Sequence, residues 1–112
     1  QVPTIGIQEL KKLISTQFPT LKKDYVEQFA LLFNDLQMKS DHAEISTKGV
    51  DLRGLLAAIG LMQKGLSPLQ AMEMGIIYKT FDRFEQDIVR DVVLLRIPDI
   101  KDSSELFETE AS

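Results

Sequence analysis

Residues 51–71 read DLRGLLAAIGLMQKGLSPLQA, and they predict a helix, a glycine stop and the start of a second helix. Asp51 is the expected N-cap, and the apolar residues that follow recur at three- and four-residue steps, as on one helix face. This stripe consists of Leu52, Leu55, Leu56, Ile59 and Met62. Gly65 suits the left-handed position after a helix, and Ser67 and Pro68 then supply an N-cap and a first-turn proline.

Two helices and a loop are predicted before this stretch. Residues 7–14 carry a short helical stripe that should end before Pro19, because the residue preceding a proline is pushed out of the helical region. Residues 21–38, which Thr20 is expected to cap, place their apolar side chains on one face of a long helix. Residues 39–50 are mostly polar and predict an exposed loop.

The last helix is predicted over residues 82–97, where Asp82 and Glu85 have the spacing of a capping box. Its expected stripe is Phe81, Phe84, Ile88, Val92 and Leu95, widened by Val89 and Val93. Residues 71–77 continue the short helix that Ser67 begins. The fold class is therefore all-α, a compact bundle of about five helices around one core. The expected core includes Phe29, Leu32, Phe33, Leu55, Leu56, Ile59, Ile88 and Val92.

Charge divides the 112 residues into a neutral body and an acidic end. Residues 1–98 hold 12 basic and 12 acidic side chains, whereas residues 99–112 hold five acidic side chains and one lysine and are predicted to be a disordered tail. A nucleic-acid-binding domain usually carries a basic excess, which is missing. The chain has no cysteine, which excludes disulfides and thiolate metal sites. No apolar run reaches the roughly 18 residues that span a bilayer, and the default location is the cytoplasm.

Two patterns approach known binding motifs without completing them. Residues 60–67 have the glycines and the serine of a phosphate-binding loop, but Leu66 replaces the essential lysine, so a helix C-cap is the favoured interpretation. His42, with Asp41 and Glu44 beside it, is one loop histidine without preorganised partners, which favours a solvated residue over a metal ligand. The chain offers no catalytic constellation.

Two interpretations concern the short helix that begins after Ser67. Its methionines could line an adaptable groove, although their helical spacing among Leu and Ile favours the core. They are Met72 and Met74, with Met62 from the helix before. Residues 65–78 also resemble the turn and second helix of a helix-turn-helix. Only Gln70 beside Glu73 is available to read bases, so DNA binding is a minor alternative.

Arg53 is the most informative charge in the sequence. It lies in the first turn of its helix, where the helix dipole disfavours a cation by a few tenths of a kcal/mol. An exposed arginine paired with a carboxylate such as Asp51 is one interpretation. A guanidinium aimed at phosphate oxygens is the other.

The run ISTKGVDLRGLLAAIGLMQKGLSPLQA, followed by MGIIYKTFDRFEQDIVRDVV, resembles the C-terminal helical lid of an AAA+ ATPase, and most of all the MoxR and dynein-related branch. The resemblance covers residues 5–97. It rests on Ser46 and Thr47 before a helix, an arginine in the first turn of that helix, and a Gly-Leu-Ser-Pro helix start about a dozen residues later.

The resemblance implies a lid that packs over ATP and Mg²⁺ bound by a separate α/β core domain. Arg53 matches the phosphate-sensing arginine called sensor 2, and Lys48 is the alternative if the register is shifted. Walker A, Walker B, sensor 1 and the arginine finger have no counterpart in these residues, so the fragment alone is expected not to be an enzyme. Its parent would be an ATPase that forms a ring, usually a hexamer, with neighbouring subunits. MoxR-type members act as chaperones that help to activate metalloenzymes, often with a von Willebrand A-type partner.

A hypothesis from a different class is a stand-alone helical module that binds a partner helix through its apolar stripes.

Overall fold

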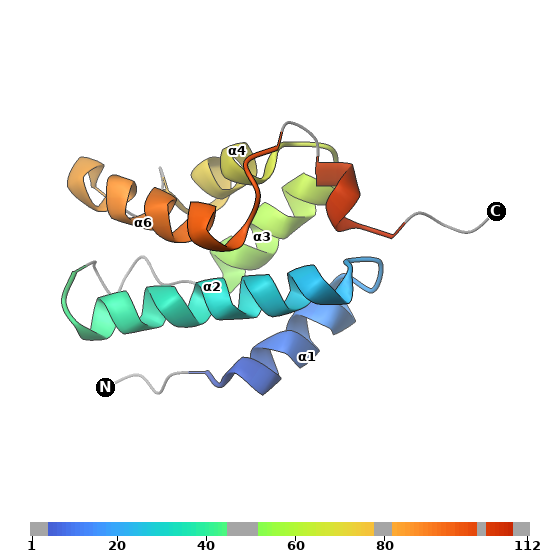
Figure 1. The fold of residues 1–112 in the computed structure, drawn as a ribbon, viewed down its shortest axis with the longest axis horizontal. Helices are drawn as coiled ribbons and strands as arrows, with labels where there is room; N and C mark the ends of the chain where they lie inside the picture. Colours follow the sequence, from blue (N-terminus) through green and yellow to red (C-terminus); the bar gives the residue numbers. More distant parts are fainter. Residues whose placement is uncertain (1–4, 45–51, 78–81, 101–102, 109–112) are drawn as a thin grey trace.

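The computed structural model describes residues 5–44, 52–77, 82–100 and 103–108 (Figure 1). These residues form five α-helices, one π-helix and one 3-10 helix, and no strand occurs among them apart from one isolated β-bridge. The predicted all-α class and the number of helices are confirmed.

A helical hairpin begins the fold. Helix α1 (Ile7–Gln17) ends at Phe18, immediately before Pro19, as predicted, and α2 (Lys23–Asp41) packs against it. The buried side chain of Gln37 accepts a hydrogen bond from the backbone N–H of Ile5 and donates one to its carbonyl oxygen, at 3.1 and 3.3 Å. This pair of bonds ties the segment before α1 to α2.

The bounds of α2 differ from the predicted 21–38. Thr20 is not its cap: the N-cap is Lys22, and no side chain makes a capping hydrogen bond there. The reason is tertiary, because the Thr20 carbonyl accepts a hydrogen bond from the N–H of Glu108 and Leu21 forms an antiparallel bridge with Phe107. At its other end α2 extends through residues 39–41, which the sequence placed in a loop.

The stretch that organises the sequence folds as its local signals predict. Helix α3 (Leu52–Gln63) ends at a Schellman turn, in which the N–H of Gly65 bonds to the carbonyl of Met62 and that of Leu66 to Leu61. Gly65 has a φ of +113°, the conformation that favours glycine. Ser67 then caps α4 (Pro68–Met72) by accepting a hydrogen bond from the N–H of Gln70. The expected cap of α3, Asp51, lies outside the described residues.

Helix α4 continues into a π-helix, η2 (Glu73–Ile77), which the sequence did not predict. The buried residues Ala71 and Met72 are followed five positions later by the buried pair Ile76 and Ile77. An α-helix would turn residues five apart away from each other by about 140°, whereas i→i+5 bonding brings them to one face. Met74 falls between them and is half exposed, so its assignment to the core is wrong.

Helix α6 (Arg83–Arg96) begins with the predicted capping box. The Asp82 side chain accepts from the N–H of Glu85, and the Glu85 side chain accepts from the N–H of Asp82. The helix is rotated relative to the predicted stripe, however. Val89, Val92 and Val93 are buried, Ile88 is half buried, and Phe84 and Leu95 are 78% and 80% exposed. Phe81 lies outside the described residues.

The capping box gives a direct test of this helix start. Replacing Asp82 by alanine should lower the free energy of unfolding by about 1 kcal/mol, because the N–H of Glu85 loses its acceptor. Asp91→Ala is the matched control, since that carboxylate is exposed in the middle of the same helix and should have a smaller effect. Urea denaturation measures both, and equal losses would contradict the cap.

The acidic end packs onto the body where it is described. A short 3-10 helix, η3 (Ser103–Leu106), lies against α3, and its Leu106 is fully buried. The Ser103 hydroxyl donates to the carbonyl of Leu66, and the N–H of Lys22 donates to the carbonyl of Leu106 at 2.9 Å. The prediction of a disordered tail therefore does not hold for residues 103–108, because a few apolar residues anchor them.

This docking should be visible in hydrogen exchange. The Lys22 amide is expected to be protected in the wild-type chain, and Leu106→Ala should speed its exchange by about tenfold or more by loosening the segment that holds its acceptor. The Leu36 amide in the middle of α2 is the internal control and should change much less. A Lys22 amide that exchanges equally fast in both proteins would show that the segment does not dock in solution.

One core joins these elements. Helix α6 packs against α2, α4 and η2, and so links the hairpin to the second half of the chain (Figure 1). The predicted core is confirmed except for Leu56 and Ile88, which are only half buried. The largest fully buried side chains are Phe29, Leu10, Ile14, Leu32, Leu36, Leu55, Ile59, Met62, Met72, Ile76, Ile77 and Ile97.

Candidate functional site

Arg53 is the second residue of α3 and is exposed to solvent, as the sequence predicts. Its backbone belongs to the first turn, where the free N–H groups and the positive end of the helix dipole lie. No acidic residue lies in this first turn. The guanidinium therefore adds positive charge to an already positive helix end. Lys48, the alternative candidate, lies outside the described residues.

The start of α3 is held by a close approach of two backbones. A Cβ added to Gly54 would lie 2.9 Å from Cγ1 of Ile76 and 3.1 Å from the carbonyl oxygen of Gly75. A Cβ added to Gly75 would lie 3.0 Å from that of Ala58 and 3.1 Å from the Gly54 carbonyl oxygen. Side chains at either glycine would push the two helices apart. The residue next to Arg53 is thus fixed directly against η2.

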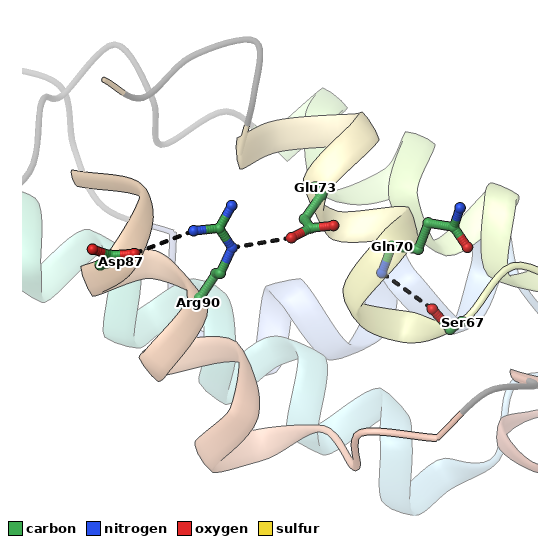
Figure 2. A network of polar contacts seen from close by, with 5 residues as sticks. All are labelled: Ser67, Gln70, Glu73, Asp87 and Arg90. Atoms are coloured by element: carbon green, nitrogen blue, oxygen red, sulfur yellow. Dashed lines mark hydrogen bonds and ion pairs between the residues drawn. The ribbon is translucent and has the colours of Figure 1, made fainter. Parts of the chain in front are cut away.

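An ion-pair network fixes η2 in turn. Figure 2 shows the Arg90 guanidinium of α6 between two carboxylates, with Nε 3.0 Å from Oε2 of Glu73 and Nη1 3.2 Å from Oδ1 of Asp87. Arg90 and Glu73 are both largely shielded from solvent, whereas Asp87 is exposed. The pair between Arg90 and Glu73 crosses from α6 to η2, so it resists separation of these elements. The same view shows the Ser67 cap at the start of α4.

A second ion pair joins α6 to the hairpin. Nε of Arg96 lies 2.8 Å from Oδ2 of Asp35, and Nη2 lies 3.4 Å from Oδ1. The hydrogen bond to Asp35 raises the pKa of the Arg96 guanidinium above its ordinary value. A raised pKa favours the charged form, and the stability it contributes is lost only at strongly alkaline pH. Arg96 therefore stays charged throughout the physiological range.

These contacts form a continuous path from the hairpin to Arg53. Asp35 of α2 holds Arg96 of α6, and Arg90 of the same helix holds Glu73 of η2. Gly75 of η2 then contacts Gly54, the residue after Arg53. The backbone that carries Arg53 is therefore held in a defined place relative to the rest of the fold.

The remaining sequence candidates do not assemble into a site. His42 is exposed at the C-terminus of α2, and no group of three or more His, Asp and Glu side chains suited to a metal ion occurs in the described part of the chain. Residues 60–67 form the end of α3 and the cap of α4, as the favoured interpretation predicted. Gln70 is exposed, but α4 is only five residues long before the π-helix begins, which is unlike a regular recognition helix.

Sequence reasoning missed the exposed apolar surface of α6. The stripe predicted for this helix includes Phe84 and Leu95, whereas Val89 and Val93 lie on the face that is buried. The number of apolar residues could have revealed this surface, because α6 carries more of them than one face of a helix can bury. The ion pairs of Asp35 and Glu73 had no local signal, because their partners are distant in the sequence.

Within the described residues, none of the helices has the length and apolar character required to cross a membrane. Comparisons with protein-family models, with curated proteins and with solved structures find no match to this chain.

Proposed function

We propose that the chain is the C-terminal helical lid of an AAA+ ATPase of the MoxR type, and that Arg53 senses the phosphates of ATP bound by a preceding core domain. The observation that carries the proposal is the placement of Arg53, exposed in the first turn of α3 and mounted on the contact between Gly54 and Gly75. A helix selected for stability alone would favour an acidic residue in that turn. The five-helix all-α fold is compatible with this role.

The chemistry assigned to this chain is electrostatic. Phosphoryl transfer needs little covalent participation from the protein, and it depends on positioning and on stabilising charge at the phosphate oxygens. A guanidinium supplies a permanent charge and a planar set of N–H donors that match those oxygens. The core domain would hold ATP and Mg²⁺, and this chain would contribute the arginine and close over the nucleotide.

The proposed role also extends to motion. A lid that moves as one body needs contacts between its helices, and the ion pairs of Arg96 and Arg90 connect α6 to α2 and to η2. ATP hydrolysis in the parent would turn lid against core, and the ring of subunits would pass that rotation to a client protein. The resemblance to MoxR-type chaperones, which help to activate metalloenzymes, often with a von Willebrand A-type protein, indicates the class in which a client and partner are to be sought.

The test uses the gene and the purified parent. The reading frame upstream of residue 1 should encode an α/β core with a Walker A motif, within about 250 residues, the size of an ordinary core domain. The parent should hydrolyse ATP, and the 112-residue chain alone should not. An upstream sequence without a phosphate-binding loop, or turnover by the isolated chain that a substitution in it removes, would overturn the proposal.

A stand-alone helical interaction module is the second candidate, and the exposed Phe84 and Leu95 favour it. Such a module would need no ATPase core, so the upstream sequence distinguishes the two functions. The apolar surface of α6 does not include Arg53, and its role can be examined under either function.

A further inference from the structure

Helix α6 has a second apolar face besides the buried one. Phe84, Ile88 and Leu95 follow one another at steps of four and seven residues, so they lie along one side of the helix, opposite Val89 and Val93. This line extends for about 17 Å at 1.5 Å per residue. Single exposed apolar residues are common on protein surfaces, but an aligned row on one helix indicates a place where another helix can pack.

A groove widens this face at its C-terminal end. A hollow of ≈ 330 Å³ lies between the last turns of α2 and α6, and Met38, Val92 and Leu95 supply its apolar wall. Met38 is 51% exposed, and methionine adapts readily to the shape of a partner. Lys39, His42 and Glu44 stand on the side of α2, where Lys39 and Glu44 form an ion pair at 3.3 Å. The hollow is large enough for one leucine or phenylalanine side chain from a partner.

The exposed charges of α6 select the kind of partner. Asp91 is exposed and acidic in the middle of α6, Asp87 is exposed but pairs with Arg90, and Arg83 is the one exposed basic residue of the described helix. Asp91 lies one turn from both Ile88 and Leu95, which puts a carboxylate within the apolar row. A partner with lysine or arginine beside its own apolar stripe would pair with the Asp91 carboxylate.

We propose that this surface, Phe84, Ile88 and Leu95 with Met38, binds an amphipathic helix whose apolar stripe is flanked by basic residues. Pairing with a second copy of the chain is disfavoured, because Asp91 lies near the middle of the row and two copies would bring their acidic residues together. An anionic membrane surface is disfavoured by the same carboxylates. The inference does not depend on the ATPase proposal.

Two synthetic helical peptides test the proposal directly. Both carry leucine at three- and four-residue steps, one with lysines at the flanking positions and the other with glutamates. The lysine peptide should bind the 112-residue chain in calorimetry and shift the amide resonances of Phe84, Ile88, Leu95 and Met38. The glutamate peptide should bind at least about tenfold more weakly.

Single substitutions distinguish binding at this surface from nonspecific hydrophobic binding. Leu95→Ser and Phe84→Ser should each weaken binding of the lysine peptide about tenfold or more, whereas Leu13→Ser, an exposed leucine on α1, should change it little. Asp91→Lys should weaken the lysine peptide and strengthen the glutamate peptide. All four positions are exposed or partly exposed, so circular dichroism should show intact folds.

Several results would overturn the proposal. The proposal fails if the lysine peptide does not bind at millimolar concentration or if both peptides bind with equal affinity. It also fails if the resonance shifts fall on another surface of the chain. Sedimentation showing a dimer that Leu95→Ser dissociates would assign the surface to a second copy instead. Binding to phosphatidylglycerol vesicles through the same residues would assign it to a membrane.

Discussion

Replacing Arg53 by alanine in the full-length parent should lower the rate of ATP hydrolysis by about 10³-fold, on the proposal that its guanidinium stabilises the transferring phosphoryl group. Arg53→Lys should recover only part of the rate, because an ammonium keeps the charge and loses the planar set of donors. The measurement is a steady-state ATPase assay together with nucleotide affinity.

The control for the Arg53→Ala variant is a measurement of its folding stability. The side chain is exposed, and removing an exposed charge typically changes the free energy of unfolding by about 0–1 kcal/mol, so the melting temperature of the isolated chain should hardly move. Lys48→Ala should reduce the ATPase rate much less. If Lys48→Ala abolishes activity and Arg53→Ala does not, the phosphate-sensing role belongs to Lys48. If neither variant changes the rate, the phosphate-sensing proposal fails.

The second large effect concerns two neighbouring leucines of α3. Leu55 is fully buried, so Leu55→Ala should lower the free energy of unfolding by about 2–5 kcal/mol through lost contacts and a residual cavity. Leu56 is only half buried, so Leu56→Ala should cost clearly less. Urea denaturation of both variants at equal m-value measures the difference. A loss at Leu56 equal to that at Leu55 would show that α3 is rotated from its described position.

Local signals determined the parts of the fold that were predicted correctly. Gly65, Ser67 and Pro68 each restrict the backbone where they stand, and the capping box of Asp82 closes within one helical turn. These features need no distant partner. The placement of Arg53 in the first turn of α3 was predictable for the same reason.

The errors occurred where distant contacts decide the structure. Thr20 has the chemistry of a cap, but its carbonyl bonds to Glu108, and the helix starts later. In α6 two apolar faces were present, and the sequence does not say which one meets α2. The π-helix was foreshadowed only by the five-residue spacing from Ala71 to Ile76. In each of these three places, tertiary packing determines the structure and overrides the local sequence preference.

The candidate site, too, was predictable only in the part that local sequence signals determine. Periodicity and the helix dipole identify Arg53, but the contact between Gly54 and Gly75 behind it is invisible in the sequence, because each glycine alone suggests only flexibility. The ion pair of Arg90 with Glu73 likewise joins helices whose relative position must be known first. Resemblance supplied the phosphate-sensing hypothesis, and kinetics on the parent will test it.

The bridge between Leu21 and Phe107 has a consequence for synthesis of the chain. Residues 103–108 leave the ribosome after every other described element, yet they supply partners for the turn between α1 and α2. Nascent chains fold from the N-terminal side as they emerge. The α1–α2 hairpin can therefore form early, but the bonds from residues 106–108 to its turn form only when the last described residues have emerged. A nascent chain stalled before Leu106 would leave part of the apolar core that Leu106 joins exposed to chaperones.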